Sequence, residues 1–403
     1  MPEFEYTART LEGDLRHGFE VAQDERDLEK KITERNLVMV RASVGKSTAK
    51  LPFLDRFQSV PIVQKMFFTQ YLEVMIRAGF SISRALQTLA DQTSSRYFRR
   101  VILEIRGDVE SGMSLSKSLA KHPRVFNEMY VNMISAGETS GKLDEVLNRL
   151  SIKMKKDHSL VGKIKGALTY PIIIVTVMLA IAILMTVVVI PKLTEVFKEA
   201  NATLPFATKV LIAVSNFLIH NGLLVTVVAI AFISIWLRII RSRKGKRMFD
   251  AAVLRIPILG PIVKKISLAR FSRSLSSLLE TNIPIIEAFA IIGRTMGNTF
   301  YREALHNAGI NLKTGSTIAK SLRQYPRLFP PLVTQMIAVG EESGSLDSIS
   351  GDLAGFYEDE VDQTMSNLST IIEPVLMLLL GVGVAGIAVA VILPIYSLSQ
   401  QIG

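Results

Sequence analysis

The chain has 403 residues, 49% of them hydrophobic, with a mean hydropathy of +0.32, which favours a protein with membrane and soluble parts over a single soluble domain. It has no cysteine, so disulfides, thiolate catalysis and thiolate-bound metals are excluded. The net charge is +11, yet many of the basic residues flank apolar runs, where membrane topology and anionic lipid explain them. We therefore expect anionic lipid as a partner of these residues, and no nucleic acid.

The first 45 residues predict a small α+β module that precedes everything else. We expect no cleavable signal peptide, because the opening residues carry acids and no apolar core. Residues 46–64 are typical of a linker, since two prolines interrupt a polar stretch. The expected elements of the module are strands at 4–9 and 16–22, a turn at 11–14, a helix at 24–36 and a third strand at 38–40.

Residues 68–193 recur without a gap at an offset of 203, so the chain contains two copies of one unit. Phe68 and Pro171, for example, match Phe271 and Pro374. Helical periodicity, with glycines after several segments, predicts that each copy is a bundle of six helices around one core. The predicted bundles span 65–168 and 264–371, and the helices of the first are expected at 66–78, 83–92, 97–111, 115–121, 127–136 and from 143 onwards.

Each copy ends in an uncharged run of 19 residues, bounded by a proline at both ends. At about 1.5 Å per residue each run is roughly 30 Å long, the thickness of a bilayer core. A third apolar run closes on Trp236 and has no counterpart in the repeat. We place the prolines at helix ends, because proline lacks the N–H that a helix interior uses. The predicted membrane helices are 171–191, 221–240 and 374–394.

Lysine and arginine are concentrated before the first span and after the second, and are sparse in the loop between these spans. Such an excess marks the cytoplasmic side of a membrane. The sequence therefore predicts a multi-pass protein whose N-terminus and both bundles are cytoplasmic. The basic connector at 241–263 is expected in the cytoplasm too, whereas the loop at 192–220 and the tail at 395–403 are expected outside.

No pattern in the sequence predicts catalysis. Gly45-Lys46-Ser47 lacks the first glycine of a phosphate-binding loop, and Pro52 follows where the helix of such a loop would continue. The five histidines share no metal-ligand spacing. We expect a protein that is not an enzyme and that has no catalytic residue, cofactor site or metal site.

The densest match between the two copies is the motif Gly-Glu-x-Ser-Gly. It is not a nucleophile elbow, because serine stands fourth rather than third. We favour a structural turn, in which the first glycine ends the fifth helix, the serine caps the sixth and the last glycine allows close approach; the alternative is direct partner binding. A turn does not need the glutamate, which indicates a salt bridge or a partner contact. The candidate residues are Gly137, Glu138, Ser140 and Gly141 in the first copy, and Gly340, Glu341, Ser343 and Gly344 in the second.

Equivalent faces of the two copies carry opposite charge. Lys155 and Lys156 occupy the positions of Glu358 and Asp359 in the second copy. This difference predicts that copy one pairs with copy two, within a chain or between neighbouring subunits, with charge fixing the register. In the alternative interpretation, the lysines only anchor the first span to anionic lipid and the acids only keep the second bundle soluble.

These features together resemble the GspF/PilC family of inner-membrane platform proteins. The resemblance covers nearly the whole chain and rests on the strand Phe-Glu-Tyr-Thr-Ala-Arg at 4–9, the duplicated Gly-Glu-x-Ser-Gly-x-Leu, and Tyr170-Pro171 and Glu373-Pro374 at the entries to two spans. It implies a protein of the bacterial inner (plasma) membrane in a type II secretion or type IV pilus machine. It also implies that the protein contacts a hexameric cytoplasmic assembly ATPase and other inner-membrane assembly components, and couples the ATPase to extraction and polymerisation of pilins or pseudopilins.

The last span carries two pairs of small residues four positions apart, Gly381 with Ala385 and Gly386 with Ala390. Such pairs let a neighbouring helix approach closely. We expect this face to pack on another span of a platform homo-oligomer or on a pilin helix. The alternative is a lipid-facing helix that tolerates glycine.

Two helical domains connected to membrane spans, with no nucleotide loop, favour a mechanical role independently of the resemblance. The alternatives are a small-solute membrane transporter and a membrane-anchored scaffold. Transport pathways usually place ionisable residues or broken helices at mid-membrane, and the middle of each apolar run is uncharged. Binding of a small ligand by the purified protein would favour the scaffold.

Overall fold

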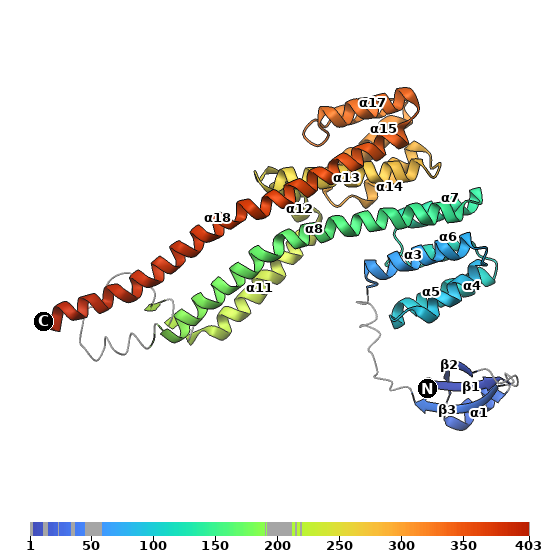
Figure 1. Cartoon of the computed structure of the whole chain (residues 1–403), viewed down its shortest axis with the longest axis horizontal. Helices are drawn as coiled ribbons and strands as arrows, with labels where there is room; N and C mark the ends of the chain where they lie inside the picture. Colours follow the sequence, from blue (N-terminus) through green and yellow to red (C-terminus); the bar gives the residue numbers. More distant parts are fainter. Residues whose placement is uncertain are drawn as a thin grey trace. The chain divides into compact units, whose positions relative to one another are not determined.

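The computed structural model describes residues 3–10, 15–22, 24–33, 37–44, 59–189, 191, 212–213, 216–217 and 220–402 (Figure 1). The chain divides into a small unit that consists largely of residues 1–60 and a helical unit that begins at Pro61. The turn predicted at 11–14, the Gly45-Lys46-Ser47 segment and most of the linker and of the loop at 192–220 lie outside the described residues.

The N-terminal unit is a three-stranded antiparallel sheet with one helix packed on it. Its strands lie in the order β2-β1-β3, so the first strand is central. Leu28 and Ile32, one turn apart on the helix, are buried with Ala8 and Ala22. The predicted order of strand, strand, helix and strand is confirmed. The bounds are β1 Glu3–Thr10, β2 Leu15–Val21, α1 Glu25–Thr33 and β3 Leu37–Val44.

The first helical bundle has the six predicted helices. Its core contains Phe68, whose ring lies 5.7 Å from that of Phe126, together with Met133 and Leu147. The first helix ends where Gly79 takes the left-handed conformation, at φ +84°, as predicted. The bounds are α3 Ile62–Arg77, α4 Ile82–Gln92, α5 Arg96–Glu110, α6 Leu115–Ala120, α7 Glu128–Ser140 and α8 Leu143–Leu184.

The second bundle repeats the first, element by element. Phe271 takes the place of Phe68, and its ring meets the rings of Phe289 and Phe329 edge-on at 6.0 and 5.4 Å. Asn282 replaces Gly79 and also adopts a positive φ, of 59°. The bounds are α13 Leu259–Leu279, α14 Ile285–Thr295, α15 Thr299–Lys313, α16 Ile318–Arg323, α17 Pro331–Ser343 and α18 Leu346–Ile402.

Within the described residues, three helices are long and apolar enough to cross a membrane. They are α8, which continues into the π-helix η1 Met185–Val189; α11 Gly222–Arg241; and α18. The segment predicted as a basic connector after the second span contains a further helix, α12 Arg243–Arg255, which begins where the Ser242 hydroxyl accepts a hydrogen bond from the Gly245 N–H at 3.1 Å.

The prediction that Pro171 and Pro374 start new helices is wrong. Pro171 lies inside α8 and Pro374 inside α18, so the sixth helix of each bundle runs on into the apolar run without a break (Figure 1). A proline removes one backbone hydrogen bond but has a helical φ, and a long helix continues when the bonds on either side are kept. Each bundle is therefore joined to a membrane segment by a continuous helix rather than by a loop.

Candidate functional site

The two glycines of each Gly-Glu-x-Ser-Gly motif have roles opposite to those predicted. Gly137 lies inside α7, where an added Cβ would approach Val146 Cγ2 to 3.0 Å and Leu143 Cα to 3.2 Å. Gly141 is the residue that ends α7, with φ +71°. In the second bundle Gly340 and Gly344 are placed in the same way. The first glycine thus permits the tight helix crossing, and the last one takes the left-handed cap conformation.

The glutamate of the motif caps a neighbouring helix instead of forming a salt bridge. The carboxylate of Glu138 accepts hydrogen bonds from the backbone N–H groups of Leu115, at 2.5 Å, and Ser116, at 2.9 Å. These are the first N–H groups of α6, which have no partner within their own helix. The carboxylate is charged and faces the N-terminus of α6, so both its charge and the dipole of the helix strengthen these hydrogen bonds.

Glu341 caps α16 in the same way, accepting from the N–H groups of Ile318 at 2.8 Å and Ala319 at 3.3 Å. Ser140 and Ser343 do not cap the sixth helices as predicted. Their hydroxyls donate back to the carbonyls of Ala136 and Val339 within their own helices. The motif therefore ties the fourth, fifth and sixth helices of each bundle together.

The two bundles contact each other through α8, which packs on α13 and α18, and through α7, which packs on α14. Among the residues that the structure describes, four ion pairs are seen across this contact. Three place a cation of α8 against an acid of the second bundle, and the fourth places Glu128 against Arg294, with oxygen–nitrogen distances of 2.5 and 2.7 Å. The α8 pairs are Arg149 with Glu280, Lys156 with Glu358, and Lys163 with Asp362.

Of the charged residues predicted to pair between the two copies, one lysine and one acid meet within the chain. Lys156 Nζ lies 3.1 Å from a carboxylate oxygen of Glu358. Glu358 also accepts a hydrogen bond from Arg273 at 2.8 Å. Lys155 and Asp359 are exposed, and the described residues show no ion pair for either. The sequence reasoning missed Arg149 and Lys163, although their spacing of seven from Lys156 would have indicated one helix face.

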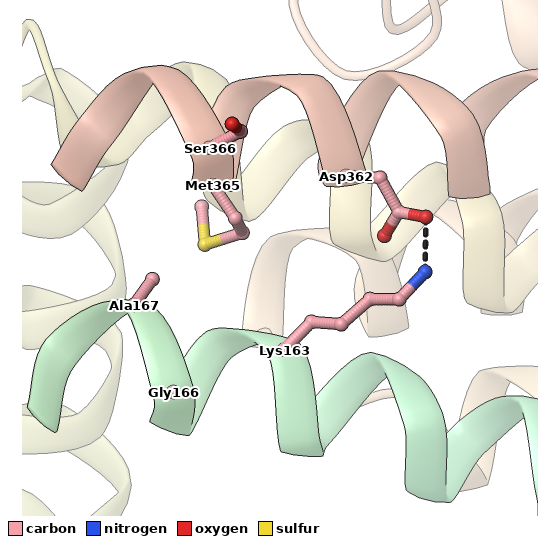
Figure 2. A pocket seen from close by; sticks show the side chains of 6 residues that line it. All are labelled: Lys163, Gly166, Ala167, Asp362, Met365 and Ser366. Atoms are coloured by element: carbon pink, nitrogen blue, oxygen red, sulfur yellow. Dashed lines mark hydrogen bonds and ion pairs between the residues drawn. The ribbon is translucent and has the colours of Figure 1, made fainter. Parts of the chain in front are cut away.

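An apolar cluster adjoins the ion pairs on the side of the membrane runs. Leu160 of α8 packs with Ile262 of α13 and with Val361, Met365 and Leu368 of α18. Figure 2 shows part of the same contact, where α8 and α18 face each other across an open pocket lined in part by Met365, and where Lys163 reaches over to Asp362. Salt bridges and apolar contacts thus hold the two sixth helices together next to their apolar runs.

Comparison with known proteins gives the family. The family described as "Type II secretion system (T2SS), protein F" matches residues 68–191 and again residues 271–394, more than half of the chain in total. The chain belongs to this family. Both matched segments end at the proline that closes an apolar run, and they are offset by the same 203 residues as the internal repeat. Each copy of the repeat is thus matched separately by the family's domain.

Relatives named for pilus assembly and relatives named for secretion align with most or all of this chain. The "Type IV pilus assembly protein PilC" of Thermus thermophilus is 34% identical over 99% of this chain and 98% of its own length. The protein of the same name from Pseudomonas aeruginosa is 35% identical over 83% of this chain and 90% of its own length. The "Type II secretion system protein F" of Xanthomonas campestris is 31% identical over the full length of both.

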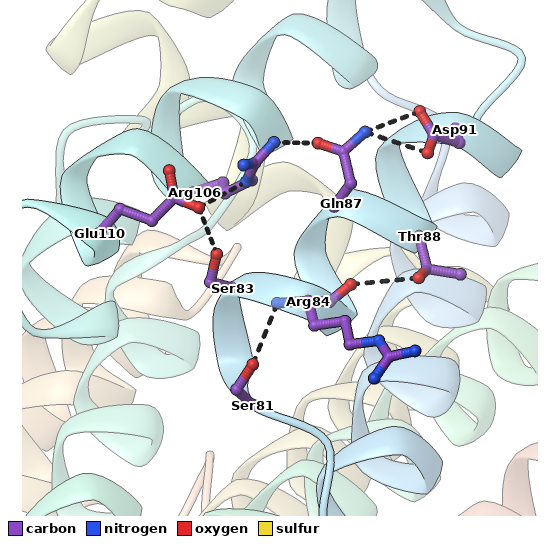
Figure 3. Close-up of polar contacts among 8 residues, drawn as sticks. All are labelled: Ser81, Ser83, Arg84, Gln87, Thr88, Asp91, Arg106 and Glu110. Atoms are coloured by element: carbon purple, nitrogen blue, oxygen red, sulfur yellow. Dashed lines mark hydrogen bonds and ion pairs between the residues drawn. The ribbon is translucent and has the colours of Figure 1, made fainter. Parts of the chain in front are cut away.

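One polar network in this family member is confined to the first bundle (Figure 3). The Ser83 hydroxyl donates to Glu110 at 2.5 Å, Arg106 pairs with the same carboxylate at 2.8 Å, and Arg106 also reaches Gln87. The hydrogen bonds from Ser83 and Arg106 lower the pKa of Glu110 below its ordinary value. At the positions of Ser83 and Gln87 the second bundle has the apolar residues Ile286 and Ala290, so the network cannot recur there.

The two glycines among the small residues of the last span lie on α18 with open space beside them. Gly381, Ala385 and Gly386 are exposed, and a Cβ added at either glycine would meet nothing within 4 Å. The side chain of Ala390 lies outside the described residues. In the described part of the chain, no group of three or more acidic or histidine side chains could hold a metal ion.

Proposed function

We propose that this protein is the inner-membrane platform of a type IV pilus or type II secretion machine. It couples a cytoplasmic assembly ATPase to the extraction and polymerisation of pilins or pseudopilins. The observation that carries this proposal is the continuity of α8 and α18, each of which is both the last helix of a bundle and a membrane segment. A displacement imposed on a bundle is transmitted along such a helix, whereas a flexible loop would absorb it. The role is mechanical rather than enzymatic.

The coupling role predicts the outcome of breaking helix continuity. A four-residue Gly-Ser insertion after Ala167 in α8, or after Ser366 in α18, should abolish piliation or secretion, because the insertion decouples bundle from span. The same insertion at Asn201, in the predicted external loop, is the control and should be tolerated. Co-purification from cells should still recover the assembly ATPase with all three variants. Normal assembly with an interrupted α8 or α18 would refute the mechanical role.

Co-purification of the unmodified protein also distinguishes the two machines, since the pilin-like proteins recovered with it belong to one or the other. Other inner-membrane assembly components and anionic lipid are expected in the same preparation. If neither an assembly ATPase nor a pilin-like protein is recovered, the proposal fails.

The topology that this role requires places both bundles and the N-terminus in the cytoplasm and the C-terminus in the periplasm. The asymmetry of lysine and arginine supports it. Reporter fusions at Asn201 and Gly403 should report the outside, and fusions at Lys50 and Gln324 the cytoplasm. A cytoplasmic C-terminus would contradict the arrangement of three spans.

The exposed small-residue face of α18 is proposed to pack on a further membrane helix, from another platform subunit or from a pilin. Close approach of helices in lipid depends on small residues at the contact. Replacing both Gly381 and Gly386 by leucine should abolish assembly while leaving membrane insertion intact. Normal piliation or secretion by that double variant would show that the face meets only lipid.

A further inference from the structure

The contact between the two bundles is head-to-tail, since each bundle contributes a different surface. The first contributes a ridge along α8, which we define by Arg149, Lys153 and Lys156 and call the α8 ridge. The second contributes a surface that we call the α13 face and define by Ser274, Ser277 and Glu280 of α13 together with Glu358 of α18. A two-fold contact would use the same surface on both sides, whereas a head-to-tail contact leaves one unused surface at each end.

The unused surfaces follow from the offset of 203. The equivalent of the α8 ridge is the α18 ridge, defined by Asp352, Phe356 and Asp359. The equivalent of the α13 face is the α3 face, defined by Tyr71, Val74 and Arg77 of α3 together with Lys155 of α8. Within the described residues no ion pair joins these two surfaces in one chain. Arg77 pairs with Glu73 on its own helix, and Asp352, Asp359 and Lys155 are exposed.

Burial separates the used surfaces from the unused ones. Ser274 of the α13 face is 5% exposed, whereas its equivalent Tyr71 is 48% exposed. The side chain of Lys153 on the α8 ridge is 11% exposed, whereas Phe356 at the same position of the α18 ridge is 47% exposed. The unused surfaces therefore present Tyr71 and Phe356 to solvent at positions whose equivalents in the internal contact are largely covered.

Both unused surfaces carry charges opposite to those of their equivalents in the internal contact. In the internal contact Arg149 pairs with Glu280, and at the equivalent positions Asp352 would face Arg77. Each position has changed sign, so the attraction is kept.

The same holds for the second pair. Lys156 meets Glu358 internally, and Asp359 would meet Lys155 at the equivalent positions. Of the remaining two contacts, Lys163 with Asp362 becomes Ser366 with Ser159, which is neutral, and Glu128 with Arg294 becomes Pro331 with Asp91, which has no pair. No like charges meet at any of the four positions.

We propose that the α18 ridge of one chain binds the α3 face of a second copy of this chain, repeating between chains the contact that joins the bundles within one. Phe356 then packs against Tyr71 and Val74, flanked by Asp352 with Arg77 and by Asp359 with Lys155. Because α8 and α18 both run from a bundle into a span, the repeated contact keeps all copies in one membrane orientation. Such a head-to-tail series closes into a ring when its rotation allows.

Disulfide trapping tests the contact directly, because the chain has no cysteine of its own. Two differently tagged copies are co-expressed, one with Arg77→Cys and the other with Asp352→Cys, and membranes are mildly oxidised. A second pair uses Lys155→Cys and Asp359→Cys. Each chain carries a single cysteine, so a disulfide that joins both tags can form only between chains. We expect this product from both pairs.

The matched control combines Arg77→Cys with Glu342→Cys, an exposed position of the second bundle outside the α18 ridge. It should give a much lower yield than the test pairs. Equal yields from control and test pairs, or no product joining the two tags, would overturn the proposal. The assay needs neither ATPase nor pilin, so its failure is distinct from failure of the platform role.

Charge reversal gives an independent measurement on the purified full chain in detergent. Arg77→Glu with Lys155→Glu should raise the dissociation constant of the oligomer on the order of tenfold or more, because two attractions become repulsions. Adding Asp352→Lys and Asp359→Lys should restore it, as followed by native mass spectrometry over a concentration series.

The proposal would be contradicted if Arg77→Glu with Lys155→Glu left the dissociation constant unchanged. It would also be contradicted if adding Asp352→Lys and Asp359→Lys did not restore the original value. Hydrogen exchange of the two bundles reports folding of the reversed variants, since it should match that of the original chain when the fold is kept. If a reversed variant does not fold, the trapping experiment, made with otherwise unchanged chains, still decides.

Discussion

The two bundles share one fold but differ in how their first helices are buried. α3 buries a single face, around Phe68 and Leu72, and leaves Tyr71 and Val74 in solvent. α13 is buried on nearly every side, with serines where its neighbours come close. The core positions of the repeat are thus alike, whereas the surfaces have diverged according to what covers them. Swapping residues between the copies separates these two constraints.

The largest expected effect on stability comes from placing a residue of the first bundle at the equivalent position of the second. Ser274→Tyr should destabilise the second bundle by about 1–3 kcal/mol, because a large ring must enter a packed contact. The reverse change, Tyr71→Ser, should alter the stability of the first bundle by only about 0.5 kcal/mol, since the ring is half exposed. Hydrogen exchange of peptides from each bundle, measured in the full chain in detergent, gives both values.

If Tyr71→Ser destabilised the first bundle as much as Ser274→Tyr destabilises the second, that result would contradict the difference in burial between the two positions. Exchange is read separately for each bundle because a protein of several domains has no single unfolding free energy.

The glutamate caps should behave alike in the two bundles, unlike the surfaces. Glu138→Ala and Glu341→Ala should each cost about 1–3 kcal/mol, since two buried N–H groups lose a charged acceptor. Local exchange of α6 and α16 measures the loss. Glu342→Ala, at the exposed neighbouring position, is the control and should stay within about 0.5 kcal/mol of the original. If one glutamate proves dispensable, the two turns are not equivalent.

A smaller effect is expected at the left-handed glycines that follow α7 and α17. Gly141→Ala and Gly344→Ala should each destabilise their bundle by about 1 kcal/mol, because alanine is strained at a positive φ. Gly107, inside α5 with open space around it, provides the control. There alanine should stabilise the helix by up to about 1 kcal/mol, so the two substitutions have opposite signs.

The smallest predicted difference is one of pH, and it concerns the first bundle alone. The pKa of Glu110 is lowered in the folded state by its hydrogen bonds, so its contribution is complete above the unfolded pKa and is lost as pH falls through the folded value. Exchange of α4 should therefore differ between the original chain and Glu110→Gln at neutral pH, and the difference should disappear in acid.

The second bundle supplies the control for this measurement, because Lys313 stands at the position of Glu110. Exchange of α14 should not respond to Glu110→Gln at any pH. A difference between the variants that persists in acid would show that the side chain acts by packing rather than by charge.

Local pattern predicted much of this architecture. The helical periodicity of 68–193 and its recurrence predicted six helices in each copy. Gly79 marked a helix end because glycine is the residue that most readily takes the left-handed conformation found there. The apolar runs were recognisable by length alone. The helix through Pro171 was not predicted, because one missing N–H does not decide whether the turns on either side continue.

Contacts between distant residues could not be read in the same way. Glu138 caps a helix that begins 23 residues earlier, and Arg149 pairs with a glutamate 131 residues away. Partners so far apart in the chain leave no periodic pattern in the sequence that would identify them. The charge reversal at Lys155 and Lys156 was visible in the sequence, but which of the two would meet Glu358 depends on how α8 is rotated against α18.

The sequence by itself determined the duplication, the helical bundles and the apolar segments, because these follow from spacing and composition within short windows. Only the tertiary structure decided that bundle and span form one helix, that Glu138 and Glu341 are caps, and that α8 fits onto α13 and α18. The physical reason is that these features are set by packing between elements far apart in the chain, where many registers satisfy the same local preferences.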